Sequence, residues 1–218
     1  MPHANTSVRV AGIWLAIASA LMVAALVFHG PIAHDLNEQM KMIADGAMRW
    51  SVVHWLAAAA LSLYAVTGLV LLTSGSRLTE GPWIMTAWAV LPVSAIWTLT
   101  TAVAEATVVA NAAVAGNYET FAAWWAFAAG KANGFAFLAL AVAVIAGNEA
   151  RRSGATPRWS AWTAAAAGVA SFAGWALGMW FGVASGNLLW LASSIVMSLW
   201  TFWFGVALMR SHLVPTSN

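Results

Sequence analysis

The feature that most constrains this chain is the grouping of its apolar residues into six long blocks with short polar segments between them. Each block has roughly 20 residues or more, the length at which an α-helix crosses the hydrocarbon core of a bilayer. Charged residues make up only 7% of the chain, too few to cover the surface of a water-soluble domain. The blocks therefore predict transmembrane helices over residues 11–29, 50–73, 83–113, 120–147, 159–183 and 187–209.

The lengths of the connections predict how these helices are arranged. Every connection except the first is short, so consecutive helices are expected to be antiparallel neighbours in one all-α bundle that forms a single domain over residues 1–218. The third block is long for one span, and tilt, a kink at Pro92 or a protruding outer end would absorb the excess. Residues 18–20 resemble a signal-peptide cleavage site, but the apolar run continues to Phe28, so we expect an uncleaved first span.

Basic residues are distributed unequally between the two sets of connections, and this asymmetry predicts the orientation. With the N-terminus in the cytoplasm, six arginines fall on the cytoplasmic side and two cations on the outer side, as the positive-inside rule requires. Both termini are therefore expected in the cytoplasm. The six cytoplasmic residues are Arg9, Arg77, Arg151, Arg152, Arg158 and Arg210, and the two outer ones are Lys41 and Arg49.

Several classes of function are excluded by what the sequence lacks. The chain has no cysteine, so disulfides, thiolate metal sites and thiol redox chemistry are absent. It has no glycine-rich phosphate loop after a strand and no nucleophile elbow. The net charge of +2 comes from the arginines that flank the spans, and no basic cluster with interleaved aromatic residues predicts a nucleic-acid partner.

The one long connection, between the first two spans, has helical periodicity. Its apolar residues recur at the spacing of one helix face, which predicts a short amphipathic helix on the outer membrane surface; they are Leu36, Met40, Ile43 and Ala47. The same segment holds His34 and further methionines, and thioether ligands select Cu(I). The amphipathic helix explains these methionines more simply than a copper site does.

Four ionisable residues lie inside the spans or at their ends, where a charge costs several kcal/mol unless it has a partner or faces a cavity. His29 ends the first span and His54 lies near the start of the second. Glu105 and Lys131 lie in the outer halves of the third and fourth spans. All four residues are thus expected in the outer half of the bundle, where Glu105 and Lys131 would face each other as an intramembrane pair.

A metal centre is the function that this constellation favours first. Neutral imidazole is the commonest metal ligand, so His29 and His54 are candidate ligands of haem b, of non-haem iron or of copper. Glu105 would be a third ligand or a proton-handling group, Lys131 would balance its charge, and His34 could replace His29. The role would be electron transfer or the oxidation of a small membrane-soluble substrate.

A glycine ridge in the fifth span has two interpretations. Gly174, Gly178 and Gly182 recur every four residues and would offer a flat surface to a bound macrocycle. Ridges of small residues more often bring two membrane helices close together, so helix packing is the favoured alternative.

Two functions without a metal stay open. A buried Glu105–Lys131 pair would suit a proton-coupled transporter or a protein that binds a lipid or small molecule. Tryptophans away from the span ends would wall an apolar pocket for a quinone, a lipid or a porphyrin; they are Trp97, Trp175, Trp180, Trp190 and Trp200. Alternatively, the chain is an accessory subunit of a larger membrane complex or a homo-oligomer, and its polar residues only fix helix packing.

Three short motifs give the chain a family resemblance. It resembles uncharacterised bacterial six-span membrane proteins through His29-Gly-Pro, Trp50-Ser-Val-Val-His54 and Glu105-Ala-Thr-Val. The turn from Arg151 to Trp159, which contains a proline, matches the same group. The resemblance implies a bacterial inner-membrane location and suggests that His29, His54 and Glu105 act as a set; it implies no particular activity.

Overall fold

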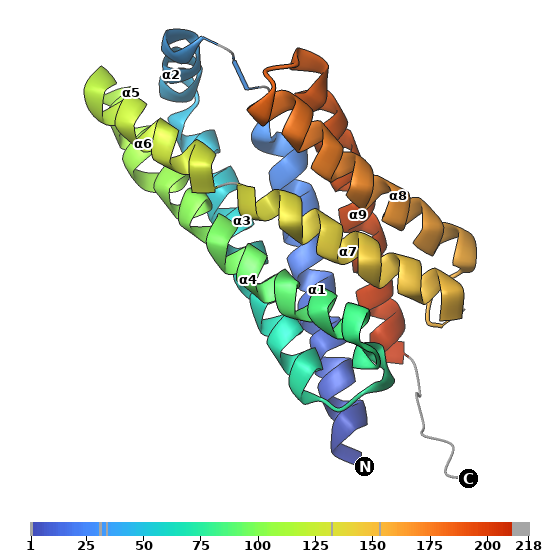
Figure 1. Ribbon diagram of the computed structural model, residues 1–218. Helices are drawn as coiled ribbons and strands as arrows, with labels where there is room; N and C mark the ends of the chain where they lie inside the picture. The colour runs from blue at the N-terminus through green and yellow to red at the C-terminus, as the bar shows by residue number, and fades with distance from the viewer. Residues whose placement is uncertain (1, 31, 34, 132, 153, 211–218) are drawn as a thin grey trace.

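The computed structural model shows an elongated bundle of helices (Figure 1). It describes residues 2–30, 32–33, 35–131, 133–152 and 154–210, without the side chains of residues 2–5 and 129–131. These residues form helices and the turns between them, and the described part of the chain contains no strand. The predicted all-α fold is confirmed.

The order of elements follows the apolar blocks. The long helices are α1 (Pro2–His29), α3 (Ala47–Thr73), α4 (Pro82–Ala104), α6 (Tyr118–Lys131), α7 (Asn133–Arg152), α8 (Arg158–Trp175) and α9 (Ala184–Arg210). The shorter ones are α2 (Leu36–Asp45), the 3₁₀ turn η1 (Arg77–Thr79), the π-helical segments η2 (Glu105–Val109) and η3 (Ala176–Trp180), and α5 (Ala110–Val114).

Five helical segments of the described chain are long and apolar enough to cross a membrane; they are Thr6–His29, Ala47–Thr73, Pro82–Val114, Tyr118–Arg152 (which includes residue 132) and Ala184–Arg210. The segment made by α8 and η3 corresponds to the predicted fifth span but is not among the five. Its sequence includes Arg158 and several tryptophans, glycines and serines among its alanines. Five of the six predicted spans are therefore matched by helical segments that are long and apolar enough to cross a membrane.

The long helices close into a ring. Helix α1 packs against α3 and α9, α3 against α4, α4 against α7, α7 against α8, and α8 against α9. Neighbours in sequence are thus neighbours in space, as the short connections predicted. The start of α1 and the end of α9 lie at the same end of the bundle, which we call the arginine end (Figure 1). The opposite end, where α1 finishes, is the His29 end.

Small residues allow close approach between helices of the ring. A Cβ atom added at Gly12 of α1 would lie 2.8 Å from the carbonyl oxygen of Gly205 of α9. One added at Gly68 of α3 would lie 2.6 Å from Cδ of Pro92, which α4 carries in its interior. Interfaces of this kind are typical of membrane bundles, where packing holds the helices together.

The irregularities near the His29 end differ from those that the sequence predicted. Helix α4 continues through Pro92, and the long third block leaves α geometry only at the π-helical segment η2. Near the same end, α8 changes into the π-helical segment η3. Single π-helical turns occur mostly within α-helices and often at functional sites.

The predicted short helix between the first two spans is present as α2 at the His29 end. Asp35 caps its first turn by accepting a hydrogen bond from the backbone N–H of Glu38 at 2.9 Å. Ile43 is buried, and Leu36 and Met40 pack into the same cluster, so the face that helical spacing predicted is the face that contacts the bundle. This cluster includes Trp50 from α3.

Two of the three glycines of the ridge pack against α9, whereas a Cβ atom added at Gly182 would meet no atom of the described chain within 4 Å. A Cβ atom added at Gly174 would overlap the backbone of Trp190, and one added at Gly178 would overlap Asn187. Both glycines therefore provide the close helix packing that was the alternative to a cofactor surface. Neither of them lines the cavity described below.

Candidate functional site

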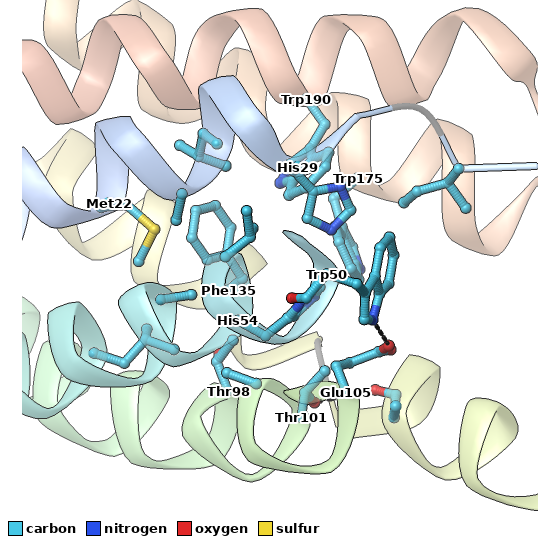
Figure 2. A pocket seen from close by; sticks show the side chains of 18 of the residues that line it. Met22, His29, Trp50, His54, Thr98, Thr101, Glu105, Phe135, Trp175 and Trp190 are labelled. Atoms are coloured by element: carbon cyan, nitrogen blue, oxygen red, sulfur yellow. Dashed lines mark hydrogen bonds between the residues drawn. The ribbon is translucent and has the colours of Figure 1, made fainter. Parts of the chain in front are cut away.

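A cavity of about 110 Å³ lies inside the ring toward the His29 end (Figure 2). Its walls come from α1, α3, α4, α6, α7, α8, η2, η3 and α9, together with Ile32 from the connection after α1. Most of its lining is aliphatic or aromatic, and the polar exceptions are His29, His54, Thr98, Thr101 and Glu105.

The spacing of the lining residues shows that helices, and not loops, fix the shape of the cavity. On α3 they are Trp50, Val53, His54, Ala57 and Leu61, which share one helical face. From Trp50 to Leu61 the helix rises about 16 Å, so the cavity is elongated along the bundle axis. Met22, Leu26 and His29 make the matching face of α1.

The two histidines of the cavity meet, as the sequence predicted. Their ring centroids lie 5.2 Å apart. His29 Nδ1 lies 3.0 Å from the carbonyl oxygen of Gly30, and His54 Nδ1 lies 2.8 Å from that of Trp50. A carbonyl oxygen only accepts, so each Nδ1 carries the proton and donates it. In the neutral form, each ring therefore keeps the Nε2 lone pair as an acceptor.

Trp50 is the central side chain of this group. Its ring lies 5.1 Å from that of His29, 4.5 Å from that of His54 and 6.3 Å from that of Trp125. Its indole N–H donates to Glu105 Oε2 at 3.2 Å. No role at the site was predicted for Trp50 from the sequence. The signal that indicates such a role is its position four residues before His54, on the same helical face.

Glu105 is buried, with 7% of its surface exposed, at the first residue of the π-helical segment η2. Within the described residues, its carboxyl group has one hydrogen bond, which it accepts from the indole N–H of Trp50. Trp50 stands between His29 and Glu105 in Figure 2, so the indole separates this histidine from the carboxyl group.

The predicted metal ligands do not come together as a set of three. No group of three metal-binding side chains is placed to hold an ion within the described ranges. His34 lies outside those ranges, and Lys131 ends α6 with its side chain outside them, so a His34 ligand and a Glu105–Lys131 pair stay predictions.

Haem b also stays a prediction, and this arrangement does not favour it. Two imidazoles on opposite sides of one iron would have ring centroids about 6.3 Å apart, from metal–nitrogen bonds near 2.0 Å. The rings of His29 and His54 are closer, at 5.2 Å, and meet edge to face.

The deeper end of the cavity is apolar. The hydroxyl of Thr98 donates to Ser94 O at 2.9 Å and that of Thr101 to Ala128 O at 3.1 Å, so both protons are already used. The other side chains there are Met22, Leu26, Leu61 and Phe135. The cavity is therefore amphipathic along its length, with imidazoles near the His29 end and hydrocarbon below.

Two of the five tryptophans that were expected to wall a pocket do so. Trp175 and Trp190 line the cavity, whereas Trp97, Trp180 and Trp200 do not. The indole N–H groups of Trp175 and Trp180 both donate to Asn133 Oδ1 at 2.9 Å, which ties the start of α7 to the junction of α8 and η3. The buried N–H of Trp190 has no hydrogen-bond partner in the described structure.

Comparison of the chain with protein-family models, with curated proteins and with solved structures finds no match in any of the three. The resemblance to bacterial six-span proteins stays a prediction. The function is argued below from the cavity itself.

Proposed function

We propose that this chain is a six-span protein of the bacterial cytoplasmic membrane with both termini in the cytoplasm. The continuous helical segment of α8 and η3, which corresponds to the predicted fifth span, supports a total of six spans. This segment packs in the ring beside α7 and α9. The positive-inside rule supports the orientation, because the connections at the arginine end carry most of the basic residues.

Within that bundle, the cavity binds a small amphipathic molecule. The observation that carries this proposal is the pair of imidazoles, His29 and His54, each fixed by an Nδ1–H bond to a backbone carbonyl. Their Nε2 atoms are acceptors at one end of a cavity whose other end is hydrocarbon. A ligand with a hydrogen-bond donor on an apolar body matches both ends. This proposal develops the small-molecule alternative of the sequence analysis.

The apolar body supplies most of the binding free energy and the donor fixes the orientation. Burial of apolar surface contributes about 25 cal/mol per Å². A hydrogen bond to an imidazole adds about 0.5–1.5 kcal/mol, and leaving the buried acceptor unpaired costs about 1–3 kcal/mol. Such a pocket distinguishes a hydroxylated ligand from its hydrocarbon analogue mainly through the histidines.

Binding of 4-butylphenol to the protein in nanodiscs, measured by equilibrium dialysis against empty nanodiscs, tests the proposal. We expect saturable binding, and we expect His54→Ala to weaken it about tenfold, the equivalent of one buried hydrogen bond. The matched control is Trp55→Ala, because Trp55 is the next residue on α3 but is 51% exposed and outside the cavity. Absence of saturable binding, or equal losses in both variants, would overturn the proposal.

A metal ion at His29 and His54 is the second candidate. The observation that favours it is again the Nδ1–H bond of each ring to a carbonyl oxygen, which is how metal-binding histidines are commonly oriented. Elemental analysis of the purified protein, with absorption spectra of the oxidised and reduced forms, tests it. Stoichiometric zinc, copper or iron that is lost in His29→Ala supports this candidate, and a Soret band would support haem. A protein without metal or chromophore, from cells supplied with both, contradicts it.

A further inference from the structure

Trp190 adds a second requirement on any molecule that occupies the cavity. Its side chain lines the cavity and is only 8% exposed, yet its indole N–H has no hydrogen-bond partner within the described chain. Buried N–H groups are paired in the great majority of proteins, and an unpaired one is costly. A bound molecule with an acceptor atom near Trp190 would remove that cost.

The position of Trp190 places this donor close to the acceptor of His29. The two rings have centroids 6.2 Å apart and meet edge to face. An oxygen atom that is hydrogen-bonded to both rings can join two ring nitrogens that lie up to about 5.8 Å apart. A distance of 6.2 Å between the ring centroids allows such a bridge. A hydroxyl group is suited to it, because its O–H donates to Nε2 while its oxygen accepts from the indole.

The surrounding walls are aromatic at the same level. The ring centroid of Trp190 lies 5.3 Å from that of Trp175 and 5.8 Å from that of Phe135, and both of these contacts are edge to face. Trp50 and Trp125 line the cavity from the side of α3 and α6. Aromatic rings attract one another in edge-to-face and offset arrangements at these separations, so the walls favour a ligand that has an aromatic ring next to its hydroxyl.

We propose that the ligand is a hydroxyaromatic molecule, a class that includes phenols and hydroquinones, and that Trp190 selects its oxygen. The hydroxyl donates to His29 or His54 and accepts from the Trp190 N–H. The aromatic ring lies among Trp50, Trp175 and Phe135, and the apolar substituent points toward Leu61. This inference rests on the proposed small-molecule function and names its ligand class.

A series of four probes separates the parts of this proposal. In 4-butylphenol the ring carries a donor and an acceptor, in 4-butylanisole only an acceptor, and in butylbenzene neither; 1-hexanol has a hydroxyl without a ring. Equilibrium dialysis in nanodiscs, corrected with empty nanodiscs, gives each affinity. We expect 4-butylphenol to bind most tightly, each lost hydrogen bond to weaken binding roughly threefold to tenfold, and 1-hexanol to bind more weakly than 4-butylphenol.

The substitution Trp190→Phe keeps an aromatic ring and removes the N–H. We expect the ratio of the affinities for 4-butylanisole and butylbenzene to fall to about one in this variant, because the acceptor no longer has a donor. The matched control is Trp200→Phe, since Trp200 also has a buried, unpartnered indole N–H but lines a separate small cavity. The control should keep the wild-type ratio, and since each ratio is measured within one variant, a partial loss of folded protein leaves it unchanged.

The outcomes distinguish the two proposals. If none of the four probes binds saturably, the small-molecule function fails and this inference fails with it. If all four bind with equal affinity, or if Trp190→Phe keeps the wild-type ratio, the cavity is a binding site but the hydroxyaromatic class and the role of Trp190 are wrong.

Discussion

Two groups of buried polar side chains lie at different depths of the same bundle and satisfy their hydrogen bonds differently. The hydroxyl cluster consists of Ser19, Tyr64 and Thr201 from α1, α3 and α9. The imidazole pair consists of His29 and His54, which are about 15 Å farther along α1 and α3 by helical rise. The same two helices therefore carry both groups.

The hydroxyls of the cluster find their partners within the protein, in one another and in the backbone carbonyls of Leu15 and Ser198. Ser19 Oγ lies 3.1 Å from the Tyr64 hydroxyl and 2.8 Å from Thr201 Oγ1, and the last two oxygens are 3.2 Å apart. The adjoining cavity has only about 10 Å³, room for about one water molecule. The imidazole pair, by contrast, borders about 110 Å³ and keeps an acceptor on each ring. We infer that the first group holds helices together and the second binds a ligand.

The substitution Tyr64→Ala should have the largest effect on stability. It removes a fully buried ring and one member of the hydroxyl cluster, so we expect the free energy of unfolding to fall by about 3–5 kcal/mol, as for other large aromatic truncations. Reversible unfolding in mixed micelles measures this change. The preference for 4-butylphenol over butylbenzene should stay at the wild-type value in the protein that remains folded. A lost preference would mean that the two groups are one functional unit.

Filling the cavity should have the opposite pattern. Ala57 lines the cavity on α3 between His54 and Leu61, and Ala57→Leu would occupy space that the ligand needs. We expect binding of 4-butylphenol to weaken about tenfold, roughly 1.4 kcal/mol, while the thermal midpoint is unchanged or higher, since the added side chain fills a void. The matched control is Ala65→Leu, a buried alanine of the same helix that is outside the cavity. This control should lower stability through overpacking, and a similar loss in Ala57→Leu would show that no usable space exists there.

The smallest effect concerns Thr67, which is buried on α3 with a hydroxyl that has no partner in the described part of the chain. Thr67→Val replaces that hydroxyl with a methyl group of similar shape. We expect the free energy of unfolding to be unchanged or to rise by about 1 kcal/mol, because an unsatisfied buried group is removed. Differential scanning calorimetry measures it. A clear loss of stability would show that the Thr67 hydroxyl has a hydrogen-bond partner, such as a buried water molecule. The bundle near Thr67 would then contain space for another molecule, as it does beside the imidazole pair.

The meeting of His29 and His54 could be predicted from the sequence because depth in the membrane follows from position within a span. The helices, their order and their antiparallel packing follow from the same apolar blocks. The rotation of each helix about its own axis cannot be predicted from these blocks. Spans that are apolar all round lack the amphipathic signal that identifies the inward face. This is why no role at the site was predicted for Trp50, although it is buried and donates to Glu105.

The hydroxyl cluster and the helix irregularities were missed for a related reason. Ser19 also donates to Leu15 O within its own helix, so its sequence context resembles that of any serine in a membrane helix. The π-helical segments η2 and η3 contain no proline that would mark them. Tertiary contacts accompany η3, because Trp175 before it and Trp180 at its end both donate to Asn133 Oδ1 of α7.

Photolabelling tests most directly the central claim that the imidazole end of the cavity is a ligand site. A 4-alkylphenol with a diazirine on its ring is irradiated with the protein in nanodiscs, and the labelled peptides are identified by mass spectrometry. We expect labels on cavity residues such as Trp50, Trp190 and Met179, reduced strongly by excess 4-butylphenol and less by the same concentration of butylbenzene. Labels confined to outward-facing residues such as Trp55 and Trp83, or labels that neither competitor reduces, would contradict the account.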